Sequence, residues 1–126
     1  MSNIKRILVP VDGSVSSAKA VEQATYLAGQ CGAALDFLYV ASDINKDIPS
    51  NLVFDEIWKK LPEGQAAEKH VESGNVAKAI VRIAASAKDD LIIMGSRGLG
   101  IFRGALIGSV SQKVLEESPI PVMVVK

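Results

Sequence analysis

Three glycines and one serine near the C-terminal end of the chain have a spacing suited to phosphate binding. The pattern is G-x2-G-x9-G-S, where x counts intervening residues, and it is formed by Gly95, Gly98, Gly108 and Ser109. Glycines reach positive φ and let ligand oxygens approach the backbone, while N–H groups at the start of a helix attract anions. The pattern follows an apolar run and leads into a helix-like run. It therefore predicts an anion site, with a triphosphate as the candidate ligand.

Each member of this motif also has an ordinary structural interpretation. Turn formation after a strand would account for Gly95 and Gly98, but it does not explain the full spacing. Ser109 stands three residues before Gln112, which is the spacing of a capping box, so its hydroxyl either caps the helix or contacts phosphate. We favour the phosphate contact because of the flanking glycines.

Charged residues near these segments have two interpretations each. Arg97 and Arg103 are placed to neutralise phosphate charge, although arginines in exposed loops are more often solvated. Asp12 directly follows an apolar run, and it is either a turn residue or a ligand contact. Because a carboxylate repels phosphates, we expect Asp12 at the sugar hydroxyls of a nucleotide or joined to the phosphates through a cation.

The chain has one cysteine and one histidine, so an intrachain disulfide and a metal site of paired cysteines are excluded. Cys31 continues an apolar helical pattern and is predicted to be a small core residue. His70 lies in the alternating segment AEKHV and is predicted to be an ordinary strand-surface residue. We expect neither side chain to be catalytic.

Hydrophobic periodicity predicts strands that alternate with helices along the chain. The strands are expected at residues 4–11, 34–40, 67–71, 91–94 and 122–125, and the helices at residues 16–31, 52–61, 76–87 and 109–117. This order indicates an α/β fold, an open parallel sheet with helices on both faces. Ligands bind such sheets beyond the carboxyl ends of the strands, where the strand order reverses. The Asp12 turn and the Gly95 loop both lie at such ends, and we expect them to form two walls of one crevice.

The composition indicates one globular domain that covers residues 1–126. Hydrophobic residues make up 48% of the chain and charged residues 22%, which is enough for a core and too little charge for extended disorder. The 14 basic and 14 acidic residues cancel without a long run of one sign, so we expect no nucleic-acid or membrane partner. The opening segment has too few apolar residues for a signal peptide, and we expect a cytoplasmic location.

Three segments carry a family resemblance that spans nearly the whole chain. They are KRILVPVDGS near the start, VESGNVAKAI in the middle and MGSRGLGIFRGALIGSVSQKVLEESPIPVMVV at the end. Together they resemble the universal stress proteins, and the glycine and serine spacing of the last segment matches the ATP-binding subgroup of that family. The resemblance implies a Rossmann-like sheet of five parallel strands in the order 3-2-1-4-5. It also implies that ATP lies across the ends of the first and fourth strands.

The same resemblance assigns roles to individual residues. On the adenine and ribose side it implies the wall residues Pro10 and Val11, the side chain of Asp12 and the backbone of Val40. On the phosphate side it implies Gly95, Gly98, Gly108, Ser109 and the backbone amide of Val110, to which we add Arg97 for its charge. The chain departs from the family at residues 42–66, which are shorter than the connection that the family often carries. We expect this to weaken ATP binding or to leave the gap to a partner chain.

These observations favour an ATP-binding regulator of the stress response. We expect Mg²⁺ to arrive with the nucleotide, because the sequence shows no all-protein metal cage. Efficient hydrolysis is not expected, because no histidine, cysteine or paired carboxylate stands near the phosphate motif to activate water. The alternatives are a nucleotide hydrolase on the same fold and a nucleotide-free dimeric interaction module.

A homodimer is the expected assembly. An apolar strand at the end of the chain invites pairing with a second copy, and the resemblance supports this. The residues expected at the interface are Val122, Met123, Val124 and Val125.

Overall fold

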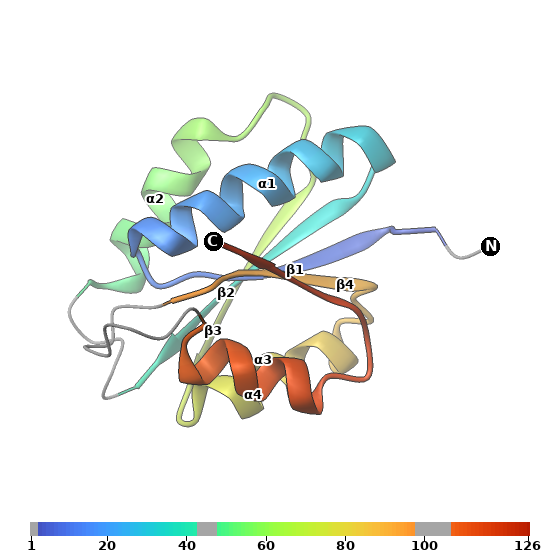
Figure 1. Cartoon of the computed structure of the whole chain (residues 1–126). Helices are drawn as coiled ribbons and strands as arrows, with labels where there is room; N and C mark the ends of the chain where they lie inside the picture. The colour runs from blue at the N-terminus through green and yellow to red at the C-terminus, as the bar shows by residue number, and fades with distance from the viewer. Residues whose placement is uncertain (1–2, 43–47, 98–106) are drawn as a thin grey trace.

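The computed structural model describes residues 3–42, 48–97 and 107–126 and contains the predicted alternation of strands and helices (Figure 1). The elements are β1 (Arg6–Pro10), α1 (Val15–Cys31), β2 (Ala34–Ala41), α2 (Ser50–Lys60), β3 (Ala67–Ser73), α3 (Val76–Ser86), β4 (Leu91–Gly95), α4 (Ser109–Glu117) and β5 (Val122–Val125). Within these described residues, no helix combines the length and apolar character needed to cross a membrane.

The strands form one parallel sheet in the order β3-β2-β1-β4-β5, which confirms the predicted topology. The central strand β1 pairs with β2 on one side, where Ile7 lies opposite Leu35, and with β4 on the other, where Ile7 lies opposite Leu91. The chain first adds strands outward from β1 in one direction and then returns to add β4 and β5 in the other. The carboxyl ends of β1 and β4 are therefore the point at which the strand order reverses.

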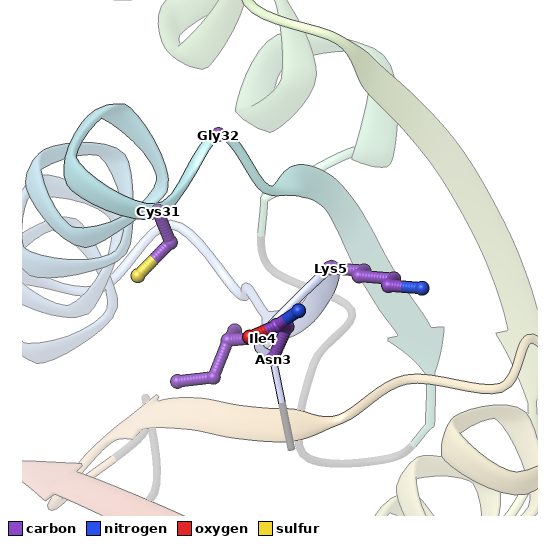
Figure 2. Close-up of a pocket in the computed structure, with 5 residues that line it drawn as sticks. All are labelled: Asn3, Ile4, Lys5, Cys31 and Gly32. Atoms are coloured by element: carbon purple, nitrogen blue, oxygen red, sulfur yellow. The ribbon is translucent and has the colours of Figure 1, made fainter. Parts of the chain in front are cut away.

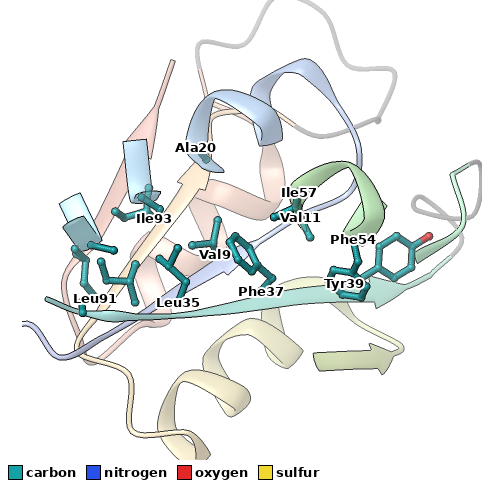
Figure 3. Close-up of a cluster of buried hydrophobic side chains, with 14 of the residues drawn as sticks. Val9, Val11, Ala20, Leu35, Phe37, Tyr39, Phe54, Ile57, Leu91 and Ile93 are labelled. Atoms are coloured by element: carbon teal, nitrogen blue, oxygen red, sulfur yellow. The ribbon is translucent and has the colours of Figure 1, made fainter. Parts of the chain in front are cut away.

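The helices cover both faces of the sheet, α1 and α2 on one and α3 and α4 on the other (Figure 1). Alternate residues of each strand point to opposite faces, so each face has its own core. Figure 3 shows the larger core, in which strand residues pack against α1 and α2. Its members include Ile7, Val9, Leu35, Phe37, Ile93, Ala20, Ala24, Val53, Phe54 and Ile57. The core of the other face includes Leu8, Leu38, Ile92, Ile80, Ala84 and Val114.

Polar caps fix where two of the helices begin. The side chain of Ser14 accepts a hydrogen bond from the N–H of Ser17 at the start of α1, and the side chain of Asn75 does the same for Lys78 in α3. At the other end of α1, Gly32 has a φ of 69°, a left-handed conformation that glycine adopts without a steric penalty. These residues fix both ends of α1 and the start of α3.

Two predictions about single side chains were wrong. Cys31 is exposed rather than buried, because the buried stripe of α1 ends at Ala28 and the chain turns away at Gly32. His70 is half-buried rather than an ordinary surface residue, because its strand lies beside β2 and its ring faces the buried carboxyl group of Asp36.

Candidate functional site

The turn after β1 is ordered by Asp12, which is buried. The Oδ1 atom of Asp12 accepts a hydrogen bond from the N–H of Ser14 at 2.9 Å, and the N–H of Asp12 donates to the Oγ of Ser17 at 3.3 Å. The carboxylate is thus part of the turn, as its ordinary structural interpretation predicted. The next residue, Gly13, has a φ of 86°, and this left-handed conformation explains why glycine stands there.

Gly95 ends β4 at the place where the start of α1 crosses the strand. A Cβ atom on Gly95 would lie 2.7 Å from both the carbonyl carbon and the carbonyl oxygen of Ser16, which is too close for any side chain. Gly95 does not have the positive φ expected of it, and Gly108 has a φ of −71°. Close approach of two backbones, rather than an unusual conformation, is the reason for glycine at position 95.

Hydrogen bonds join the β4 loop to both neighbouring helices. The N–H of Arg97 donates to the Oγ of Ser16 in α1 at 3.1 Å. The buried hydroxyl of Ser111 in α4 donates to the carbonyl of Gly95 at 2.7 Å, and the N–H of Gly108 donates to the carbonyl of Ser96. The ends of β4, α1 and α4 are therefore held together, so the structure brings the Asp12 turn and the Gly95 loop to one place.

The start of α4 differs from the predicted capping box. Gly108 is the N-cap residue and makes no side-chain cap bond, while Ser109 is the first helical residue and is exposed. Ser109 is therefore not the N-cap. The N–H groups of Ser109 and Val110 lie in the first turn, where a helix has no internal acceptor for them. This leaves an exposed hydroxyl and first-turn amides at the positive end of the helix dipole, next to the Gly95 loop.

The predicted base-side residues lie on β1 and β2. Val11 is buried, and its N–H donates to the carbonyl of Leu38 at 2.8 Å, which joins the end of β1 to β2. Val40 is buried two residues further along β2, and Pro10 is half-buried at the end of β1. The predicted residues Gly98 and Arg103 lie outside the described residues.

Sequence reasoning missed Ser16, Ser96 and Ser111, and it missed the contact between Gly13 and Ile48. A Cβ atom on Gly13 would lie 2.8 Å from the Cδ1 of Ile48, and the carbonyl of Ile48 accepts a hydrogen bond from the Tyr39 hydroxyl at 2.7 Å. Figure 3 shows that hydroxyl pointing away from the core. Of these residues, only Ser111 gave a signal in the sequence. It falls on the buried face of α4, and a buried hydroxyl needs a hydrogen-bond partner.

The chemistry of the arrangement suits an anion. Among the described residues of the Asp12 turn, the Gly95 loop and the start of α4, there is no histidine or cysteine. Cys31 lies at the far end of α1, where it lines a pocket with Asn3, Ile4, Lys5 and Gly32 (Figure 2). His70 lies on β3 beside Asp36. The site thus combines a buried carboxylate, helix-terminal amides and an exposed arginine.

Known proteins resemble this chain along its whole length. The model of the universal stress protein family matches residues 3–126. A universal stress protein of Thermus aquaticus is 33% identical over 137 residues, which cover 97% of this chain and 98% of the relative. The universal stress protein YxiE of Bacillus subtilis is 32% identical over 145 residues, which cover 96% and 98%. A universal stress protein solved in complex with cAMP has a TM-score of 0.80 and 29% identity, with 98% of each chain covered.

Proposed function

The chain belongs to the universal stress protein family, and we propose that it binds ATP across the carboxyl ends of β1 and β4. The observation that carries this proposal is the close packing of Gly95 against Ser16, together with the start of α4 beside them. That packing brings a helix N-terminus and the Asp12 turn to the point where the strand order reverses. The relative of 29% identity that was solved with cAMP supports an adenine nucleotide as the ligand class.

Within this proposal the phosphates lie at the start of α4. The hydroxyl of Ser109 and the amides of Ser109 and Val110 donate to phosphate oxygens, and charge-assisted bonds of this kind are the stronger ones. Gly95, Gly98 and Gly108 keep the loop close to the ligand, and Arg97 supplies positive charge. Mg²⁺ enters bound to the phosphates, since carboxylates and phosphate oxygens are the ligands it prefers.

The adenosine moiety lies on the other side of β1. Asp12 accepts hydrogen bonds from the ribose hydroxyls, the backbone of Val40 contacts the adenine, and Pro10 and Val11 form the wall behind it. A carboxylate suits the ribose side because it accepts from hydroxyl groups and repels phosphates. The protein then holds the nucleotide without efficient turnover and acts as a nucleotide-responsive regulator.

Calorimetric titration with Mg·ATP tests this assignment. Wild-type protein should bind one ATP per chain, and Ser109→Ala should weaken binding about 10-fold or more, because a hydrogen bond to a charged group contributes about 1.5–3 kcal/mol. Ser86→Ala, on the exposed end of α3, is the matched control and should bind like wild type. Equal affinity in the Ser109→Ala and wild-type proteins would contradict the phosphate assignment.

A further inference from the structure

Four ionisable side chains gather on the sheet face that α3 and α4 cover, toward the amino ends of the strands and away from the proposed ATP site. Arg6 opens β1, Asp36 lies near the start of β2, and Glu68 and His70 lie on β3. Asp36 is paired in register with Glu68, and Leu38 with His70. Residues two apart on a strand share a face, so the sheet itself holds Asp36, Glu68 and His70 together.

The acceptor atoms of three of these side chains converge. The Nε2 of His70 lies 3.5 Å from the Oδ1 of Asp36 and 3.9 Å from the Oε2 of Glu68, and all three atoms lie within 4.8 Å of one another. A tetrahedral zinc site with ligand bonds of about 2.0–2.2 Å separates its ligand atoms by about 3.3–3.6 Å. The pair formed by His70 and Asp36 already has this separation. Glu68, whose side chain is 65% exposed, has room to close the remaining gap.

One ring nitrogen of this cluster has no hydrogen-bond partner within the described part of the chain. The Nε2 atom of His70 is buried and has no hydrogen-bond partner among the described residues. Buried polar atoms without partners are rare in native proteins, and an ion that binds at the site is one explanation for them.

Two carboxyl groups share one guanidinium in this cluster. The Nη2 of Arg6 lies 2.6 Å from the Oδ1 of Asp36 and 3.6 Å from the Oε2 of Glu68. Arg6 therefore faces both carboxyl groups from one side.

Arg6 leaves room for an ion on Asp36. Its Nη2 donates to the Oδ1 of Asp36 at 2.6 Å, and its Nε donates to the Oδ2 at 3.3 Å. Each carboxylate oxygen has two lone pairs, so Oδ1 can accept from Arg6 and bind an ion on its other side. Hydrogen bonds from a neighbouring residue commonly orient a carboxylate that binds metal.

We propose that Asp36, Glu68 and His70 form a binding site for a divalent metal ion of the zinc class, with water as the fourth ligand. An imidazole with two carboxylates suits zinc better than Mg²⁺ or Ca²⁺, which prefer oxygen ligands alone. The exposed side of Glu68 opens the site to solvent. A bound ion would join the edge strand β3 to β2, at the opposite end of the sheet from the proposed nucleotide.

Calorimetric titration of the full chain with Zn²⁺ alone, without nucleotide and without an affinity tag, tests this proposal. Wild-type protein should bind one Zn²⁺ per chain. His70→Gln and Glu68→Gln should each lower the affinity on the order of 100-fold or more, since even residues outside the ligand shell contribute about 10–100-fold. Because His70 is the only histidine, its imidazole nitrogen NMR signals report directly on binding, and the Nε2 signal should shift with Zn²⁺.

Two control variants separate this site from other ways of binding Zn²⁺. Glu72→Gln removes a carboxylate from the same face of β3 that pairs with Arg82 instead, and Cys31→Ser removes the only thiol. Both should bind Zn²⁺ like wild type. Absence of binding up to about 1 mM Zn²⁺, binding that survives His70→Gln and Glu68→Gln, or binding that is lost in Cys31→Ser would overturn the proposal.

Discussion

Gly95 illustrates what a single missing side chain does in this fold. It lets the backbone of Ser16 lie directly against the end of β4, and the Oγ of Ser16 then accepts the N–H of Arg97. The spacing of the motif predicted that glycine matters here, but for the wrong physical reason. Ser16 and Arg97 stand 81 positions apart in the chain, so local sequence cannot reveal such a contact.

Gly95→Ala should destabilise the protein and weaken ATP binding together. The added Cβ would meet the backbone of Ser16 at 2.7 Å, and forced overpacking of this kind costs about 1–3 kcal/mol of unfolding free energy. Urea denaturation measures this loss, and an ATP titration measures the effect on binding.

The matched control for this change is Gly29→Ala. Gly29 lies in α1, and a Cβ atom added there would meet no atom of another element within 4 Å. Alanine should therefore stabilise the helix by about 0.5–1 kcal/mol. A Gly95→Ala protein as stable as wild type would contradict the close approach of the α1 backbone to Gly95.

At the level of elements, α3 shows how well local chemistry determines a helix. Its apolar positions recur at helical spacing and Asn75 caps its first turn through a hydrogen bond of 3.0 Å to the N–H of Lys78. Both features are local, so the sequence predicts this helix correctly. The start of α4 was harder, because Ser109 and Gln112 satisfy the capping-box pattern while Gly108 is the residue that caps.

Asn75→Ala should lower the unfolding free energy by about 1 kcal/mol, the usual loss when a side-chain N-cap is removed. Thermal or urea denaturation checks this value. Asn51→Ala is the control, because Asn51 is exposed inside α2 and alanine is the better helix former. Equal destabilisation by the two substitutions would argue against the cap.

At the level of the whole molecule, the exposed edge of β5 is the place where we propose that two chains pair. Met123 is 40% exposed and is absent from both cores, whereas Val122, Val124 and Val125 pack partly against them. Met123→Lys therefore places a charge on the edge without disturbing the interior, and it should convert a dimer to a monomer. Sedimentation equilibrium measures the mass.

Leu52→Lys provides the control for this experiment. Leu52 is an exposed apolar residue on α2, a helix whose Trp58 packs against Phe37 of β2. This variant should keep the mass of wild type. A Met123→Lys protein that remained dimeric would exclude pairing through β5.

The sequence predicted the order of elements, the sheet topology and the meeting of the Asp12 turn with the Gly95 loop. Alternating apolar runs and their caps are local, and the resemblance supplied the strand order. The cluster of Asp36, Glu68 and His70 was not predicted, because it depends on the register between β2 and β3. Asp36 and Glu68 lie far apart in the chain, and no local pattern encodes that register.

Mass spectrometry of small molecules released from natively purified protein tests the central claim most directly. We expect ATP at close to one molecule per chain, because in the proposed site Ser109, Val110 and the Gly95 loop bind its phosphates. Protein that releases no nucleotide and also fails to bind added Mg·ATP at about 1 mM would contradict the proposed function.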